Sequence, residues 1–127
     1  MTPNRTVLVC EDDASIRALL KRVVTREGYA VEVAATGSEA LRRIEEGRHA
    51  AIVLDLMLPG MTGVEIIERL RRTNPTLLTR IVVITASTPA LNKPPQEVGV
   101  FFAKPFDIHA LTSSLRRIAN EECPFAT

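Results

Sequence analysis

The chain has 127 residues, of which 46% are hydrophobic and 24% are charged, values that fit one compact domain and leave little room for a second. Its 16 Lys and Arg residues nearly balance its 15 Asp and Glu residues, which argues against a nucleic-acid-binding surface. The longest apolar runs are strand-sized, far below the ~20 residues that span a bilayer. The polar N-terminus and the two cysteines, Cys10 and Cys123, indicate neither a signal peptide nor a disulfide framework. We therefore expect a reduced, cytoplasmic protein.

Short β-rich runs alternate with helical patterns along the chain. The runs predict strands at 6–10, 29–34, 50–54, 81–85 and 100–103. The first helix carries an apolar stripe and stops near Gly28; the stripe comprises Ile16, Leu19, Leu20, Val23 and Val24. This alternation predicts an α/β fold with a parallel sheet covered by helices on both sides.

The next helices begin with capping signals. Thr36 with Glu39, and Thr62 with Glu65, match the capping-box pattern. Gly47 ends the second helix, and Asp107 caps the last one. The buried stripes are predicted to be Ala40, Leu41 and Ile44, then Val64, Ile67 and Leu70, and finally Ile108, Leu111, Leu115 and Ile118.

The segment 87–99 departs from this plan. It contains Pro89, Pro94 and Pro95, and adjacent prolines are unfavourable inside a helix. A crossover between parallel strands usually contains a helix. We predict here a proline-rich loop with at most one short helical turn.

Ionisable and hydroxyl side chains follow four of the five predicted strands. Glu11 and Asp12 follow the first, Asp55 the third, Thr85 closes the fourth, and Lys104 follows the fifth. Ligands of open parallel sheets bind outside the carboxyl ends of the strands. Clustered carboxylates need a compensating cation, and a hard divalent ion with oxygen ligands fits. A carboxylate beside such an ion can attack phosphorus, and Asp55 on the central strand is the candidate nucleophile.

Four segments carry a resemblance to a known family: LVCEDD at 8–13, VLDLMLPGMTG at 53–63, ITA at 84–86 and AKPF at 103–106. Together they resemble the receiver domain of two-component response regulators, over about residues 5 to 120. The resemblance implies a CheY-like, doubly wound five-stranded sheet of order 2-1-3-4-5. The whole chain, 1–127, would then be one receiver domain with a frayed tail at 121–127. The family usually has a full helix where this chain has the proline-rich segment.

The resemblance also implies roles for single residues. Asp55 matches the phosphoacceptor, and Glu11 and Asp12 match the acidic pair, with Glu11 in place of the more common Asp. Magnesium, or manganese in its place, would be held by these three carboxylates and the backbone carbonyl of Met57. Thr85 and Lys104 match the residues that meet the phosphoryl group.

Three further details follow from the same resemblance. The bond between Lys104 and Pro105 would be cis, Asp13 would cap the first helix, and Phe101 would be the aromatic switch residue. Without the resemblance, Phe101 is an ordinary core aromatic, and Phe101 and Phe102 have opposite facings. We expect His49 and His109 to face solvent.

The function implied is a phosphoacceptor signalling domain rather than a metabolic enzyme. A histidine kinase, a phosphotransfer protein or a small acyl phosphate would phosphorylate Asp55, and the altered surface would bind a downstream protein. The domain would catalyse its own phosphorylation and dephosphorylation as a monomer or weak dimer, without contacting nucleic acid or membrane.

Other functions agree less well with these residues. A phospho-independent interaction module with the same fold remains the alternative, because the proline-rich segment is unusual. A phosphohydrolase would need an acid two residues after Asp55, where Met57 stands. A flavodoxin-like cofactor site would be repelled by the acidic run after the first strand. Whether the chain acts alone or belongs to a longer regulator or hybrid kinase stays open.

Overall fold

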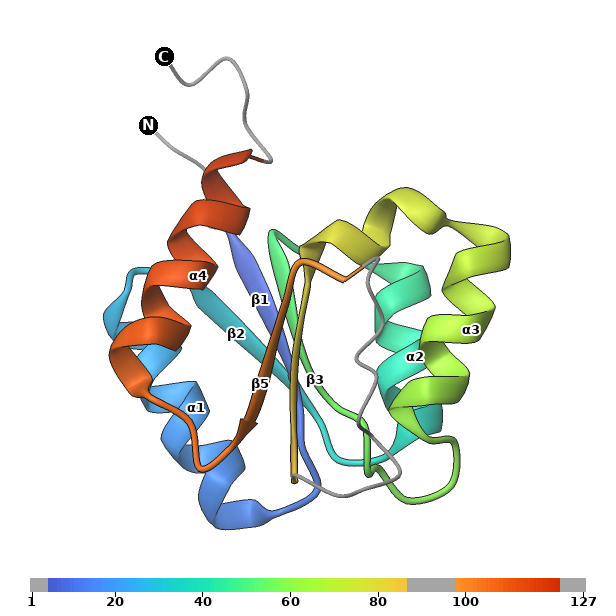
Figure 1. Ribbon diagram of the computed structural model, residues 1–127, viewed down its shortest axis with the longest axis horizontal. Helices are drawn as coiled ribbons and strands as arrows, with labels where there is room; N and C mark the ends of the chain where they lie inside the picture. Colours follow the sequence, from blue (N-terminus) through green and yellow to red (C-terminus); the bar gives the residue numbers. More distant parts are fainter. Residues whose placement is uncertain (1–4, 87–97, 122–127) are drawn as a thin grey trace.

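The computed structural model describes residues 5–86 and 98–121. They form a five-stranded sheet between two layers of helices (Figure 1). The strands are β1 (Thr6–Cys10), β2 (Ala30–Ala34), β3 (Ala51–Asp55), β4 (Ile81–Ala86) and β5 (Val100–Lys104). The helices are α1 (Ala14–Arg26), α2 (Gly37–Glu46), α3 (Gly63–Thr73), the 3-10 helix η1 (Pro75–Arg80) and α4 (Ile108–Glu121). The predicted strands are confirmed to within one residue at each end.

All neighbouring strands pair in parallel, in the order β2-β1-β3-β4-β5. This confirms the order that the family resemblance implies. Because parallel strands place their carboxyl ends at one edge, the residues that follow β1, β3, β4 and β5 come together there. The order of the sheet is what assembles the site.

Each face of the sheet carries its own hydrophobic core. Helices α2 and α3 cover one face and α1 and α4 the other, as Figure 1 shows. Leu8, Ile52 and Leu54 point to the first core, and Val7, Val9 and Val53 to the second. The whole of β3 is buried, as its nearly continuous apolar sequence predicts. Its last residue, Asp55, is therefore held on a rigid element.

The helix caps follow the sequence signals with one exception. Asp13 caps α1, Thr62 and Glu65 form a complete capping box on α3, and the Asp107 carboxylate accepts from the first turn of α4. At α2, Thr36 accepts the Glu39 N–H, but the Glu39 carboxylate accepts from Ala35 rather than from Thr36. The capping box predicted there is only half formed, because Glu39 reaches one residue further back.

Some predicted buried positions are exposed instead. Val64 is 42% exposed, and Leu19 and Ile108 are each 39% exposed. In α3 the buried stripe is Gly63, Ile66, Ile67 and Leu70. A Cβ atom at Gly63 would lie 2.7 Å from the Leu56 Cα, so this glycine lets α3 approach the end of β3. The stripe starts one residue earlier than the apolar letters suggest.

Two predictions fall outside the described residues. The proline-rich loop lies mostly in 87–97, and the frayed tail in 122–127, although Glu121 belongs to α4. Next to the first segment, Val98 packs against a core and the Gly99 N–H donates to the Ile81 carbonyl. Within 5–86 and 98–121, no helix is long and apolar enough to cross a membrane.

Candidate functional site

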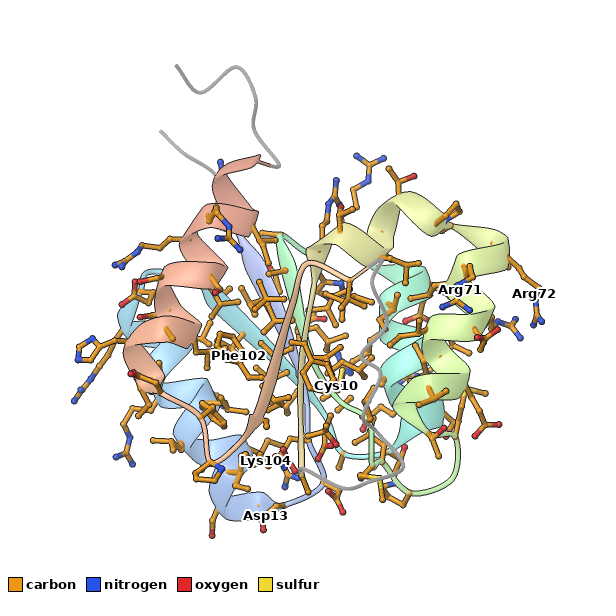
Figure 2. All side chains as sticks on the ribbon, in the orientation of Figure 1. Cys10, Asp13, Arg71, Arg72, Phe102 and Lys104 are labelled. Atoms are coloured by element: carbon orange, nitrogen blue, oxygen red, sulfur yellow. The ribbon has the colours of Figure 1, made fainter. Side chains whose placement is uncertain are left out.

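The carboxyl edge of the sheet brings together the predicted site residues. Glu11 follows β1, Asp55 ends β3, Thr85 lies near the end of β4 and Lys104 ends β5. Figure 2 shows Lys104 at this edge, near Asp13 at the start of α1. Glu11, Asp55 and Thr85 are almost fully buried, with 0–2% exposure. Buried polar groups of this kind require partners.

Lys104 is the partner of two carboxylates. Its Nζ donates to Glu11 Oε1 at 2.9 Å and to Asp55 Oδ2 at 3.0 Å. The Lys104–Pro105 peptide bond is cis, as the resemblance implies. One ammonium group thus joins the ends of β1, β3 and β5.

Burial and pairing act in opposite directions on these groups. Burial raises the pKa of Glu11, and the hydrogen bonds from Lys104 and the Asp13 N–H only partly offset it. Burial alone would lower the pKa of Lys104, but its hydrogen bonds to Glu11 and Asp55 outweigh this and raise it. Lys104 is therefore held in its charged form.

The three acids form a group that can hold a metal ion. One carboxylate oxygen from each of Glu11, Asp12 and Asp55 lies within 4.8 Å of the others. Glu11 and Asp55 are buried, whereas Asp12 is exposed and no hydrogen bond of its carboxylate is found within the described chain. Three hard oxygen donors, one of them uncommitted and facing solvent, fit a divalent cation that keeps some of its waters.

The loop after β3 positions the second oxygen of Asp55. The Met57 N–H donates to Asp55 Oδ1 at 2.9 Å, so both carboxylate oxygens accept a hydrogen bond. The Met57 side chain is 57% exposed beside the site. The role of its carbonyl as a metal ligand stays a prediction.

Thr85 differs from the buried Glu11 and Asp55 because its hydroxyl has no hydrogen-bond partner among the described residues. The residue is fully buried, and Oγ1 makes no hydrogen bond within the described residues. A threonine hydroxyl at the end of a strand commonly bonds nearby backbone, but the Thr85 hydroxyl bonds no described backbone group. A buried hydroxyl without a partner is a group that an incoming acceptor could satisfy.

The two phenylalanines of β5 face opposite cores, as predicted. Phe101 packs with the core under α2 and α3, and Phe102 with the core under α1 and α4. Figure 2 places Phe102 on the α1 and α4 side and Cys10 on the other side. Both rings are half-buried. A switching role for Phe101 stays a prediction.

His49 was predicted to face solvent, and that prediction is wrong. Its ring is buried, and Nε2 lies 2.9 Å from Glu32 Oε1 on β2. The sequence does not indicate this burial, because a polar residue in a helix-to-strand loop is usually exposed. His109 is exposed as expected.

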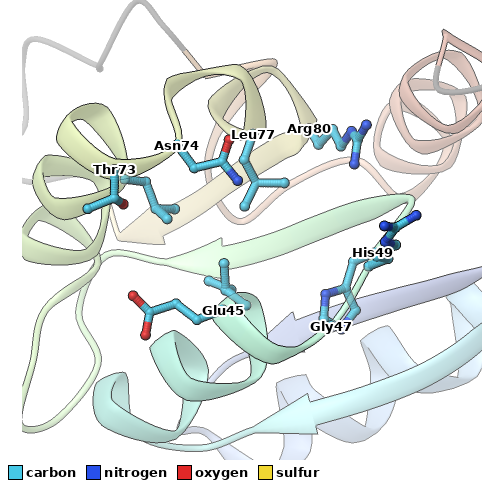
Figure 3. Close-up of a pocket in the computed structure, with 10 residues that line it drawn as sticks. Glu45, Gly47, His49, Thr73, Asn74, Leu77 and Arg80 are labelled. Carbon is cyan, nitrogen blue, oxygen red and sulfur yellow. The ribbon is translucent and has the colours of Figure 1, made fainter.

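His49 also lines a cavity of about 590 Å³ between the C-terminal ends of α2 and α3 and the helix η1 (Figure 3). Ile44, Leu70 and Leu77 supply its apolar wall. No predicted site residue lines this cavity, so it is separate from the carboxyl edge.

Arg17 makes a contact with the acidic loop that its position in the sequence does not predict. Its Nη1 donates to the carbonyls of Glu11 and Asp12 at 2.9 and 3.2 Å. The available signal was an arginine one turn into the helix that follows the acidic pair. That position is equally typical of an exposed cation.

Comparison with known proteins agrees with this geometry. The family model for the response regulator receiver domain matches residues 7–116. The chain belongs to the response regulator receiver domain family. Membership indicates a signalling domain of two-component systems rather than a metabolic enzyme.

Two relatives illustrate the range of proteins that carry this receiver domain. The chain is 35% identical over 116 residues to the transcriptional regulatory protein TcrA of Mycobacterium tuberculosis, covering 89% of this chain and 45% of the relative. It is 32% identical over 117 residues to the sporulation initiation phosphotransferase F of Bacillus subtilis, covering 90% and 93%. The chain thus spans about half the length of TcrA and nearly all of the second relative.

Solved structures give the same fold. A sensor protein from Polaromonas sp. JS666 superimposes with a TM-score of 0.81 at 32% identity, covering 94% of this chain and 98% of that one. The response regulator TrrA from Thermotoga maritima, in complex with Mg(2+)-BeF, superimposes with a TM-score of 0.79 at 26% identity, covering 90% and 98%.

Proposed function

We propose that this receiver domain accepts a phosphoryl group on Asp55. The observation that carries the proposal is that three groups meet at one sheet edge. They are the buried Asp55 carboxylate, the Lys104 ammonium that donates to it, and the Thr85 hydroxyl, which has no partner among the described residues. Burying any of these three groups for a purely structural role costs free energy. Each could instead react with or bind an incoming phosphoryl group. The acidic pair beside them supports the same chemistry.

The transfer needs no group that the chain lacks except the cation and the donor. A carboxylate oxygen of Asp55 would attack phosphorus while the bond from phosphorus to the donor's imidazole nitrogen breaks, and the electron pair leaves with that nitrogen. Lys104 would hold the negative charge of the transferred group, and the Thr85 hydroxyl would donate to one of its oxygens. Dephosphorylation would be a separate step, in which water attacks phosphorus while the bond from phosphorus to the Asp55 oxygen breaks, giving inorganic phosphate and the free Asp55 carboxylate.

We propose that Mg²⁺, for which Mn²⁺ could substitute, is held by Glu11, Asp12, Asp55 and the Met57 carbonyl. A divalent ion supplies charge neutralisation for the phosphoryl oxygens when bound. The donor set supports this assignment, since all proposed ligands are hard oxygens. TrrA is similar in fold and was solved with Mg(2+)-BeF.

An apolar surface next to Lys104 supports a protein as the phosphodonor. Ile16 and Leu19 of α1 face Pro105, Phe106 and Ile108 across a cavity of about 390 Å³. Exposed apolar groups beside a reactive site favour docking of a partner. We propose a cytoplasmic histidine kinase or phosphotransfer protein as that partner, with an unidentified protein downstream.

Phe101 is the proposed relay to the downstream surface. Its strand pairs with β4, which carries Thr85, and its ring is half-buried at the edge of the α2 and α3 core. A shift of the Thr85 hydroxyl toward the phosphoryl group would change the space next to β5.

The test is the intact mass of the full chain after incubation with a small acyl phosphate, with and without Mg²⁺. We expect a Mg²⁺-dependent gain of one phosphoryl group, absent in Asp55→Asn. Asp13→Asn is the matched control, because asparagine also caps helices and Asp13 lies outside the proposed ligands. It should gain the group as the wild type does.

Folded wild-type protein that gains no mass would contradict the proposal. That outcome would favour the alternative, a receiver-like module that binds its partner independently of phosphate.

A further inference from the structure

We propose that Arg17 is a positioning residue for the cation site, acting through the backbone of Asp12. This inference rests on the proposed function of the acidic cluster and adds a residue to it. Arg17 lies on α1, half-buried, and its guanidinium group touches neither Asp55 nor Lys104 through a hydrogen bond.

The contact itself joins one nitrogen to two carbonyl oxygens. Arg17 Nη1 donates to the Glu11 carbonyl at 2.9 Å and to the Asp12 carbonyl at 3.2 Å. These carbonyls belong to consecutive residues, so the guanidinium fixes the turn that the chain makes as it leaves β1. The orientation of that turn decides where the Asp12 carboxylate points.

Glu11 and Asp13, the neighbours of Asp12 in this loop, have further hydrogen bonds that do not involve the Arg17 side chain. The Glu11 N–H donates to the Ala34 carbonyl, and the Glu11 carboxylate is bonded to Lys104 and to the Asp13 N–H. Asp13 caps α1 through Ile16. Asp12 has no such support: within the described chain, its hydrogen bond from Arg17 is the one it makes.

Asp12 is therefore the weakly held member of the acidic cluster, and Arg17 is what restrains it. Because the guanidinium binds carbonyls rather than carboxylates, it leaves the Asp12 carboxylate free to accept a cation. An arginine has several donors in a rigid plane, whereas a lysine offers one compact ammonium on a flexible stem. Groups that orient metal ligands in this way commonly change metal affinity when they are replaced.

The experiment is calorimetric titration of the full chain with Mg²⁺ alone, comparing the wild type with Arg17→Met and Arg17→Lys. Methionine keeps much of the side-chain length and removes the donors. We expect Arg17→Met to weaken Mg²⁺ binding about tenfold, in the range seen for residues that orient ligands, and Arg17→Lys to weaken it less. At saturating Mg²⁺, phosphorylation of Arg17→Met by an acyl phosphate should stay within about twofold of the wild-type rate.

Arg22→Met is the matched control. Arg22 is exposed on the same helix, and its side chain makes no hydrogen bond to the described residues, so Mg²⁺ affinity should not change. A double-mutant comparison then tests the route: if Arg17 acts through Asp12, Arg17→Met should add little to the loss already caused by Asp12→Asn.

Three outcomes separate this inference from the function on which it rests. Wild-type Mg²⁺ affinity in folded Arg17→Met, or additive losses in the double variant, would overturn the role of Arg17 alone. A wild-type protein that binds no Mg²⁺ would overturn both. If Arg17→Met does not fold, Arg17→Lys decides, since unchanged affinity there would contradict the need for a planar donor.

Discussion

Thr85 carries a hydroxyl group that costs free energy in the structure described. An unpaired buried hydroxyl destabilises the folded state by about 1–3 kcal/mol. Its residue is fully buried and its oxygen has no partner in the described part of the chain. This cost is what the proposed role of Thr85 would account for, because an oxygen of the transferred phosphoryl group could accept from the hydroxyl.

Replacing Thr85 with valine should therefore not weaken the unphosphorylated protein. Valine has nearly the same shape without the hydroxyl, so we expect the free energy of unfolding to stay the same or to rise by up to about 1 kcal/mol. Urea denaturation of the Mg²⁺-free protein measures this. In the phosphorylated protein the sign should reverse, because the variant lacks the donor.

Thr85→Ser provides the comparison, since it keeps the hydroxyl and loses a methyl group. It should be less stable than the wild type in both states. A Thr85→Val variant that loses more than about 1 kcal/mol without phosphate would mean that the hydroxyl is already bonded.

The sequence predicts some residues of the site better than others. Asp55 and Lys104 end apolar strands, so their places follow from strand register alone. Arg17 and His49 do not lie at strand ends, and their contacts depend on where a long side chain reaches after folding. The hydrophobic periodicity of the sequence does not predict such side-chain contacts.

At the scale of elements, a single glycine, Gly63, allows α3 to pack closely against the end of β3. A Cβ atom at Gly63 would meet the Leu56 Cα at 2.7 Å and the Asp55 carbonyl oxygen at 2.8 Å. The Gly63 N–H also donates to the Leu56 carbonyl. The position of α3 and the backbone beside Asp55, the proposed phosphoacceptor, are thus coupled.

Gly63→Ala should destabilise the protein by about 2 kcal/mol or more, because backbone atoms rather than flexible side chains must move. Gly28→Ala is the control. Its φ is +97°, and an added Cβ would meet no described atom beyond its chain neighbours within 4 Å, so the cost is backbone strain alone, about 1–2 kcal/mol. Chemical denaturation gives both values. An equal or smaller loss at Gly63 would show that α3 can move away freely.

The elements themselves are largely predictable, with one clear omission. Strand positions follow from β-branched runs, and helix starts from Asp13, Thr62 and Asp107. The 3-10 helix η1 was missed because six residues carry too little periodicity to indicate a helix. The Val64 position was misjudged because a glycine, invisible to hydrophobic patterning, belongs to the buried stripe.

At the scale of the whole molecule, alkaline pH should destabilise the protein, because Tyr29 and Lys104 hold their protons more tightly in the folded state. Burial, above all, raises the pKa of Tyr29 above its ordinary value of 10.0, and pairing raises that of Lys104 above 10.5. For both groups, the folded state holds the proton more tightly than the unfolded chain. The resulting stability is present below pH 10 and is lost as pH rises through the folded-state pKa values.

Tyr29 reports this directly, because the chain has one tyrosine and no tryptophan. Absorbance of the tyrosinate should rise with a midpoint above pH 10.0 in native protein and near the ordinary value in denaturant. Circular dichroism followed in parallel should show stability declining over the same range. A native midpoint at or below the denatured one would contradict the expected sign.

The salt bridges of Lys104 have a consequence for the order in which charged molecules can enter. Four acids, Glu11, Asp12, Asp13 and Asp55, lie at the sheet edge with two cations, Lys104 and Arg17. Together they leave a formal charge of −2 when all are ionised. A phosphodonor is itself an anion, so it is repelled from this edge until a divalent cation has cancelled the excess. The domain would thus favour binding of the cation before the anionic phosphodonor. A rise in ionic strength would weaken this preference, because it screens the charges.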